Sequence, residues 1–473
     1  MLDPIGGFER IKDFFISYVE TAFRISSVQT ADQRRNLLES DGALATAPFI
    51  EPVPRYQQYK DPLEKVISDG RLSHLSQEGR DAFVELALSG LFDGEPAAGP
   101  VKRKSIFNPY IHQVEMLFRG SNPGKPGVVT SGTGSGKTES FMLPVLAAIA
   151  NEAVKWPAPN AGFLQEKWWA GGDPFVHMRR HESQQRAKAL RAIVLYPMNA
   201  LVDDQMVRLR RTLDSDEARA VMDERFAGNR IFFGQYTSAT PVTGYEKHPR
   251  KSQDKGEKAR RARRGAELRE EMRRFESDQD AARQHDAEAR RKAATAGKKA
   301  PDPTRFIFRS IDGGEMVSRW DMHRAPPDIL VTNASMLGTM LSREVEDKIF
   351  EATRDWLASD PDSYLFLIID ELHLVRGSAG TEVSFLIKSL LQRLGLDDPA
   401  KIHKLRILAS SASLPLDGEN EDHSLRYLRD LFAPYGTSQG PGDPGTQDPT
   451  FWRDCVVPGK PHLHPVPLLK LQR

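Results

Sequence analysis

The stretch TSGTGSGKTES at residues 130–140 constrains the fold of this chain more than any other part of its 473 residues. It follows a short apolar run at 127–129 and precedes apolar residues at helical spacing from Phe141, so we expect a strand, a loop and a helix. Glycines permit close approaches that a Cβ would block, so the loop amides and the helix N-terminus can surround a phosphate group. The stretch therefore predicts a nucleotide-binding loop formed by Ser131, Gly132, Thr133, Gly134, Ser135, Gly136, Lys137 and Thr138.

Two side chains at the end of this loop carry the expected chemistry. Lys137 would reach the β- and γ-phosphates of the nucleotide, and the Thr138 hydroxyl would hold Mg²⁺. The strict pattern G-x-x-x-x-G-K-[ST] is altered at its first position, where Ser131 stands. The alternative interpretation is a Gly/Ser turn that ends in Lys-Thr without binding a nucleotide.

A second candidate site follows the apolar run at 365–369, which leads directly into Asp370 and Glu371. Open α/β sheets place their chemistry at the carboxyl ends of the strands. Asp370 would hold Mg²⁺, and Glu371 would orient and deprotonate an attacking water. Charges also cap strand ends in ordinary proteins, so the pair alone is a weak signal. Downstream of a phosphate loop it predicts a catalytic set of Lys137, Asp370 and Glu371.

Composition excludes several classes of protein. The 66 basic and 65 acidic residues nearly cancel, so the net charge indicates no partner. The single cysteine, Cys455, excludes a disulfide framework and a zinc site built from several thiolates. The N-terminus lacks the apolar core of a signal peptide, and no apolar run approaches the roughly 20 residues of a membrane span. We therefore expect a cytoplasmic protein without membrane contact.

The predicted fold class is α/β. Between residues 101 and 435, helical segments alternate with apolar runs at 127–129, 192–196, 231–233, 328–332, 365–369 and 405–409. Such runs predict strands buried on both faces of a parallel sheet that lies between helices. Residues 1–100 are expected to form a small helical N-terminal extension, with an amphipathic helix over 6–26, and residues 436–473 a linker.

Two insertions interrupt the α/β region. Residues 151–187 contain several tryptophans without clear periodicity. The second insertion, at about 248–303, is charged: residues 250–299 contain 17 Lys or Arg and 10 Asp or Glu. Its composition favours helix, but its few apolar side chains cannot offset the ordering entropy of a packed core. We expect a solvated helical arm, and an arm that contacts nucleic acid is the alternative.

The motifs along residues 105–415 resemble, in the same order, those of the superfamily 2 DEAD/DEAH-type helicases. TSGTGSGKT resembles motif I, DELH at 370–373 motif II, and SAS at 411–413 motif III. YPMNALVDDQ at 196–205 and PDILVTNASML at 327–337 resemble motifs Ia and Ib, and NPYIHQ at 108–113 resembles the adenine-reading segment. The resemblance implies a RecA-like P-loop NTPase lobe that binds ATP and Mg²⁺.

The resemblance also implies roles for individual residues. Gln113 would read the adenine base, and the coupling of hydrolysis to lobe movement would involve His373, Ser411 and Ser413. Small and polar groups at the turns after two strands would bind the nucleic-acid backbone; they are Pro197, Asn199, Thr332, Asn333 and Ser335. Helix N-terminal amides and hydroxyls suit backbone phosphates, which position a strand without reading its sequence. Ordinary N-capping is the alternative role for Asn333 and Ser335.

A narrower resemblance is to bacterial helicases with a C-terminal zinc-binding domain, including those of DNA repair and phage defence. It rests on YPMNALVDDQ, on the residues GG and SRWDM between 313 and 322, and on DELHLVRGSAG from residue 370. On this ground DNA is favoured over RNA as the polymer. The cysteines of the terminal domain in those helicases are absent from this sequence.

A helicase motor has two RecA-like lobes, and the second supplies arginines to the transferring phosphoryl group. Only 59 residues follow Leu414, too few for a lobe of about 150. We therefore expect a first lobe that needs a second-lobe polypeptide, or a defence or repair complex, and that unwinds little alone. The alternatives are a non-hydrolysing nucleotide- and nucleic-acid-binding module, a truncated remnant, and an ATP-driven translocase subunit of a restriction or defence system.

Overall fold

The computed structural model describes residues 4–46, 55–132, 134–172, 174–251, 253–398, 400–416, 418–432 and 448–462. The chain divides into two compact units, Met1–Pro54 and Arg55–Arg473. The helical extension expected over residues 1–100 is thus divided, since residues 55–100 lie in the unit that contains the sheet. Among the described residues, no helix is both long enough and apolar enough to cross a membrane.

The first unit is a pair of helices, α1 (Pro4–Ala22) and α2 (Val28–Glu39). The amphipathic helix predicted over 6–26 corresponds to α1. Ser27 begins α2, because its side chain accepts a hydrogen bond from the Thr30 backbone N–H at 3.4 Å. Arg35 of α2 pairs with Glu20 of α1 at 3.3 Å, so an exposed ion pair helps to join the two helices.

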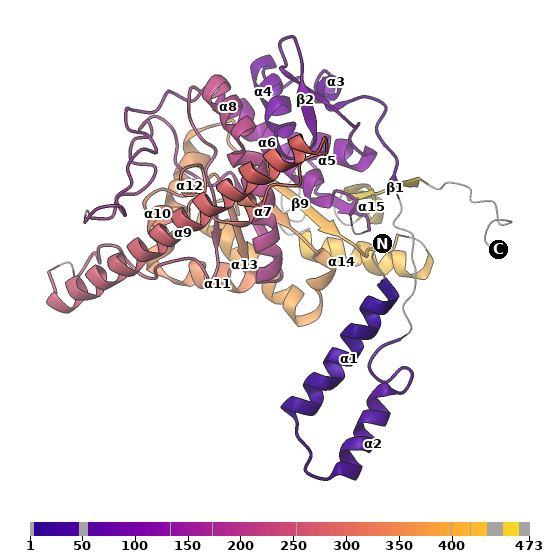
Figure 1. Ribbon diagram of the computed structural model, residues 1–473. Helices are drawn as coiled ribbons and strands as arrows, with labels where there is room; N and C mark the ends of the chain where they lie inside the picture. Colours follow the sequence, from indigo (N-terminus) through magenta and orange to yellow (C-terminus); the bar gives the residue numbers. More distant parts are fainter. Residues whose placement is uncertain are drawn as a thin grey trace. The chain divides into compact units, whose positions relative to one another are not determined.

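The second unit is built around a seven-stranded sheet in which every neighbouring pair is parallel (Figure 1). The predicted α/β fold with a parallel sheet is confirmed. In spatial order the strands are β10 (Val456–Pro458), β4 (Gly127–Thr130), β9 (Leu405–Ser411), β8 (Leu365–Ile369), β5 (Ala192–Tyr196), β7 (Ile329–Asn333) and β6 (Phe233–Tyr236).

Helices cover both faces of this sheet, which explains why its strands are apolar on both sides. Successive residues of one strand enter different cores: Val194 of β5 packs in one buried cluster and Ile193 in the other. The first core includes residues of α4 (Gln77–Ala87), α5 (Ile111–Ser121), α6 (Lys137–Ala153), α7 (Asn199–Asp214) and α8 (Asp216–Arg225). The second includes residues of α10 (Arg319–Arg324), α11 (Ala334–Ser342), α12 (Asp347–Ser359), α13 (Gly377–Leu394) and α14 (Glu421–Phe432).

Short elements complete the second unit. A helix, α3 (Leu63–Val66), precedes α4, and β2 (Gly94–Pro96) pairs with β3 (Arg103–Ser105) in an antiparallel hairpin. β1 (Arg55–Tyr56) pairs with β11 (Pro461–His462), also antiparallel. β1 and β11 therefore join the first described residues of this unit to the last.

The described part of the segment expected to be a linker is folded. Residues 448–462 form α15 (Pro449–Cys455), the edge strand β10 and then β11, whereas 433–447 and 463–473 lie outside the described residues. The apolar pair Val456 and Val457 aligns with Val128 and Val129 of β4, so it extends the buried sheet. The Gly/Pro-rich composition of the stretch before it concealed this strand from the sequence analysis.

The charged insertion is a single helix, α9 (Lys255–Thr295), of 41 residues, so the predicted helical insertion is confirmed. It is not solvated along its whole length. Leu268 and Met272 of α9 pack with Trp168 and Trp169 of the other insertion and with Trp320 of α10. The two insertions thus share one small core, in which tryptophans supply the apolar surface that α9 lacks.

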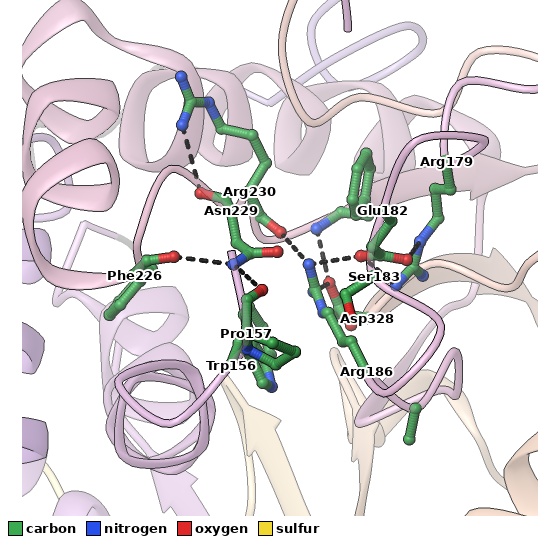
Figure 2. Close-up of polar contacts among 12 residues, drawn as sticks. Trp156, Pro157, Arg179, Glu182, Ser183, Arg186, Phe226, Asn229, Arg230 and Asp328 are labelled. Atoms are coloured by element: carbon green, nitrogen blue, oxygen red, sulfur yellow. Dashed lines mark hydrogen bonds and ion pairs between the residues drawn. The ribbon is translucent and has the colours of Figure 1, made fainter. Parts of the chain in front are cut away.

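Six charged side chains at the amino ends of the strands form the amino-edge network, which comprises Glu152, Arg179, Glu182, Arg186, Arg191 and Asp328. Arg186 and Arg191 bind the two carboxylate oxygens of Asp328 at 2.7 and 3.0 Å. Arg186 also pairs with Glu182 at 2.6 Å, and Figure 2 shows these groups pointing toward one another. The network fixes the insertion against the sheet.

Candidate nucleotide and nucleic-acid site

The phosphate loop connects β4 to α6, as the sequence predicts. Gly134 and Gly136 have φ values of 74° and 76°, a region that favours glycine. A Cβ at Gly136 would lie 2.2 Å from the Gln113 side-chain nitrogen, so only glycine fits there without a shift. Lys137 and Thr138 begin α6, whose N-cap residue Gly136 has no side chain to cap the first backbone N–H groups of the helix. Thr133 lies outside the described residues.

Side chains from other segments hold the loop in place. The Gly132 N–H donates to the Tyr56 hydroxyl at 2.8 Å, and the Ser131 and Ser135 hydroxyls lie 2.5 Å apart. His112 Nε2 lies 2.8 Å from the Ser135 carbonyl, and burial lowers the pKa of His112. The imidazole is therefore neutral at pH 7 and donates through Nε2. Sequence reasoning missed Tyr56 and His112, because neither belongs to the loop pattern.

Gln113 is hydrogen-bonded to the phosphate loop. Its carbonyl oxygen accepts a hydrogen bond from the Tyr110 N–H at 2.8 Å, and its amide donates to the Gly136 carbonyl at 3.2 Å. Only 3% of its surface is exposed. The structure therefore shows Gln113 as a support of the loop that also lines the cleft, and its adenine contact stays a prediction.

The two carboxylates directly follow β8, and β9 is the one strand that separates β8 from β4 in the sheet. Glu371 has φ 50° and ψ 49°, a left-handed conformation that is uncommon for a residue with a side chain. Its carboxylate lies 3.7 Å from the Lys137 ammonium and 3.3 Å from the His373 ring. Its second oxygen is buried without a hydrogen-bond partner. Strained backbone and an unsatisfied buried oxygen both indicate a functional position.

Asp370 is held by a serine that the sequence analysis did not single out. The Ser410 hydroxyl donates to the Asp370 carboxylate, which also accepts from the Glu371 N–H at 2.9 Å. Ser411 is buried, and its hydroxyl accepts from the Ser413 N–H at 3.3 Å. The strand register explains this contact: Ile369 aligns with Ala409, so the next residues, Asp370 and Ser410, lie side by side.

Part of the phosphate loop, Gln113 and the two carboxylates border one cleft of about 780 Å³ at the carboxyl edge of the sheet. Its lining includes Gln113, Gly134, Ser135, Gly136, Lys137, Thr138, Tyr196, Arg208, Asp370 and Glu371. Burial and the nearby Asp370 raise the pKa of Tyr196 well above its ordinary value, so its hydroxyl stays protonated. Arg208 pairs with Glu139 at 3.1 Å and adds a cation that sequence reasoning did not predict.

A second, smaller hollow of about 310 Å³ gathers most of the predicted backbone-binding residues. We call it the Ia/Ib groove; its lining is Pro197, Asn199, Ser238, Asn333, Ser335, Met336 and Thr339. The Asn333 amide donates to Asn199 at 2.6 Å, and its carbonyl oxygen caps α11 by accepting from the Met336 N–H at 2.8 Å.

Thr332 is not part of the Ia/Ib groove. Its side chain is fully buried, and its hydroxyl donates to the Tyr236 carbonyl at 2.6 Å. Ser238, which sequence reasoning missed, lines the groove in its place. Capping and groove formation are both roles of Asn333, so the two interpretations of that residue are compatible.

A parallel sheet with a phosphate loop after one strand and paired carboxylates after a nearby strand defines a RecA-like P-loop NTPase lobe. Residues 111–230 match the family described as DEAD/DEAH box helicase. The chain therefore carries a DEAD/DEAH box helicase domain, and the resemblance inferred from the motifs is confirmed.

Among known proteins, the chain is 32% identical over 432 residues to the Druantia protein DruE of Escherichia coli (strain UMEA 4076-1). That match covers 88% of this chain but only 20% of DruE, so the chain spans about a fifth of that relative. Among solved structures it is similar to the DUF1998 helicase MrfA bound to DNA, at 16% identity over 87% of this chain and 32% of MrfA, with a TM-score of 0.38. Mss116p bound to ssRNA and AMP-PNP matches at 11% identity over 80% of this chain and 45% of that chain, with a TM-score of 0.37.

Proposed function

We propose that the chain is the ATP- and nucleic-acid-binding lobe of a helicase motor, which couples ATP hydrolysis to DNA strand movement when a second lobe is present. One observation carries this proposal. Lys137 and Thr138 border the same 780 Å³ cleft as Asp370 and Glu371, although more than 230 residues separate the two pairs in the sequence. A phosphate cradle beside two carboxylates is the arrangement that nucleotide hydrolysis requires.

The cleft residues suit a nucleotide with its metal ion. Mg²⁺ prefers oxygen ligands and is commonly held by one or two carboxylates together with substrate phosphates and waters. Asp370 and the Thr138 hydroxyl are oxygen donors on the same cleft, and Asp370 is oriented by Ser410. These two residues would hold Mg²⁺, which would neutralise charge on the phosphates. Lys137 and the loop amides would bind the phosphate oxygens directly.

Glu371 is the proposed general base. Its Oε1 lies 3.7 Å from the Lys137 ammonium, and its Oε2 is buried without a hydrogen bond, 3.3 Å from His373 Nδ1. A carboxylate oxygen that makes no hydrogen bond can accept a proton from a water positioned next to the phosphate. Asp370 cannot take this role as readily, because Ser410 and the Glu371 N–H already occupy one of its oxygens.

The Ia/Ib groove is the proposed nucleic-acid contact. Its polar amides and hydroxyls, and the α11 N-terminus beside Asn333, suit backbone phosphates rather than base edges. We favour DNA over RNA because of the narrower resemblance of the motifs to DNA-repair and defence helicases. Coupling would pass through His373, which contacts Glu371, and through Ser411 and Ser413, which follow Ser410.

Titration calorimetry with ATP and Mg²⁺ tests the nucleotide assignment. Lys137→Ala should weaken ATP binding by at least about tenfold, because it removes a cation that faces the phosphates. Lys388→Ala, at an exposed lysine on α13, is the matched control and should bind like the parent protein. Equal ATP affinity for the parent and for Lys137→Ala would refute the assignment.

Nucleotide turnover is the second test, measured with and without single-stranded DNA. Glu371→Gln keeps the size of the side chain but removes its basicity, so any turnover by the parent chain should disappear while ATP still binds. A second lobe supplies further cations to the transferring phosphoryl group, so turnover should rise when such a polypeptide is added. Turnover that survives in Glu371→Gln would show that another residue is the base.

A further inference from the structure

The charged helix α9 and the loop directly before it are asymmetric in both charge and packing. Residues 247–264 contain nine Lys or Arg and two Asp or Glu, a surplus of seven. Residues 265–286 contain four Lys or Arg and seven Asp or Glu, so their balance is reversed. We call residues 247–264 the basic segment. A uniform solvated helix would have no need for such a division.

Packing holds the middle of α9, from Leu268 to Asp286, and leaves its beginning exposed. No residue of α9 before Leu268 is buried, whereas Leu268, Met272, Gln279, Ala282 and Asp286 are. Beyond Leu268, Trp169 donates to Glu276 at 2.8 Å, and the Asp286 carboxylate accepts from the Thr304 N–H at 2.8 Å. Figure 1 shows the N-terminal end of α9 extending past its neighbouring helices. A fixed helix therefore presents its basic end to solvent.

The basic segment retains cations without acidic partners. Arg261 and Arg264 anchor the segment, through an ion pair with Glu246 at 3.1 Å and a hydrogen bond to the Thr243 carbonyl at 2.7 Å. Within the part of the chain that the structure describes, no ion pair is recorded for the exposed lysines 247, 251 and 255. Lys247 and Lys251 lie in the loop directly before α9, and Lys255 is the first residue of the helix. Exposed lysines without acidic partners are suited to a polyanion rather than to internal stability.

The basic segment lies close to the Ia/Ib groove. Ser335 and Thr339 of α11 line the groove, and Glu344, two residues after α11 ends, pairs with Arg250 at 3.5 Å. A helix of nine residues is about 14 Å long, so groove and segment are within about 20 Å of each other. Ser238, which also lines the groove, lies in the loop that leads from β6 into the segment. One nucleic-acid molecule can therefore reach both surfaces.

We infer that the basic segment binds the phosphate backbone of the duplex that adjoins the strand held in the Ia/Ib groove. The first 13 residues of α9, none of which is buried, form a straight edge of about 20 Å that starts where the loop with Lys247 and Lys251 ends. A duplex carries a phosphate charge for roughly every 1.7 Å of its axis along such an edge. A flexible single strand has no such fixed row of charges. This inference rests on the proposed nucleic-acid binding and adds the duplex as the part that α9 recognises.

The test compares two triple variants of the full chain. K247Q/K251Q/K255Q removes three positive charges from the basic segment, and R290Q/K298Q/K299Q removes three from exposed positions at the other end of the insertion. Binding is measured by fluorescence anisotropy, across a series of salt concentrations, with a partial DNA duplex that has a single-stranded overhang. The overhang strand alone is measured in parallel.

We expect K247Q/K251Q/K255Q to bind the partial duplex about tenfold more weakly than the control variant and to lower the salt slope by about 3. Both variants should bind the overhang strand alone like the parent. Equal affinities of the two variants for the partial duplex, or an equal loss on both ligands, would overturn the inference while leaving the groove assignment intact. A parent chain that binds neither ligand would overturn the proposed nucleic-acid function as well.

Discussion

Charged side chains gather at both edges of the seven-stranded sheet, but they are arranged in opposite ways. In the amino-edge network, Arg186 binds Asp328 at 2.7 Å, and neither side chain is exposed. At the carboxyl edge, Lys137 and Glu371 lie 3.7 Å apart, with 12% and 23% of their side chains exposed. The first pair is closed by short bonds, whereas the second is longer and borders the cleft, so a ligand can approach both of its charges.

This difference separates structural charges from charges kept for a ligand. A buried ion requires close partners, because removing one partner leaves an uncompensated charge in a poorly polarisable interior. Glu371 instead keeps an unsatisfied oxygen and a left-handed backbone, which cost stability and persist where function requires them. We therefore expect substitutions at the amino edge to change folding and substitutions at the carboxyl edge to change binding.

The largest effect is expected at Asp328. Asp328→Asn would leave Arg186 and Arg191 without their shared negative partner and should lower the free energy of unfolding by about 3–5 kcal/mol. Urea denaturation measures this change. Asp362→Asn, at an exposed aspartate, is the control and should change stability by less than about 0.5 kcal/mol. Similar stabilities for the two variants would contradict the structural role of the amino-edge network.

The ion pairs of Asp328 also predict that the stability of the protein depends on pH. Burial alone would raise the pKa of Asp328, but Arg186, Arg191 and Arg179 outweigh it and hold the pKa below its ordinary value of 3.8. Its carboxylate therefore contributes stability above pH 3.8, and this contribution is lost as the pH falls through the lower pKa of the folded state. The difference in free energy of unfolding between the parent and Asp328→Asn should therefore become smaller below about pH 4. A difference that stays constant with pH would contradict a lowered pKa of Asp328.

A smaller effect is expected within the phosphate loop, where two glycines form a matched pair. Both have positive φ, but a Cβ at Gly136 would meet the Gln113 side chain at 2.2 Å, whereas one at Gly134 would meet open space. Gly136→Ala should therefore lower the free energy of unfolding by about 2 kcal/mol and Gly134→Ala by about 1 kcal/mol. Equal losses would mean that the contact with Gln113 contributes nothing.

The smallest effect concerns the serine that orients Asp370. Ser410→Ala removes the hydroxyl donor to this carboxylate and should weaken Mg²⁺-dependent ATP binding about fivefold, with little change in stability. Ser413→Ala is the control, because the Ser413 side chain makes no recorded bond to Asp370 among the described residues. If Ser413→Ala weakened ATP binding more than Ser410→Ala, Ser410 would not be the serine that orients Asp370 for Mg²⁺.

Local patterns predicted those parts of the molecule that one segment specifies by itself. Apolar runs of three to five residues identified the strands β4 to β9, and the glycine spacing together with Lys137 identified the loop. Asp370 and Glu371 were found because they directly follow such a run. In each case the chemistry and the structural element lie within about ten residues of each other.

Contacts between distant segments could not be predicted in this way. The partners of Asp328 lie 142 and 137 residues away, and Tyr56 reaches Gly132 over 76 residues. Ser410 became meaningful only when the alignment of β8 with β9 placed it beside Asp370. The shared core of the two insertions also escaped prediction, because each insertion supplies only part of the apolar surface.

The central claim is that charges at the amino edge of the sheet serve stability and charges at the carboxyl edge serve ligand binding. Thermal unfolding of the parent, Lys137→Ala and Asp328→Asn, with and without ATP and Mg²⁺, tests this claim most directly. A ligand that binds only the folded state raises its stability, by about 2.7 kcal/mol at a concentration 100 times its Kd. We predict that Asp328→Asn unfolds at a lower temperature than the parent but gains the same stabilisation from ATP. Lys137→Ala should unfold near the parent temperature without ATP and gain almost nothing from it. The reverse pattern, in which Asp328→Asn loses the ATP effect and Lys137→Ala keeps it, would contradict the account.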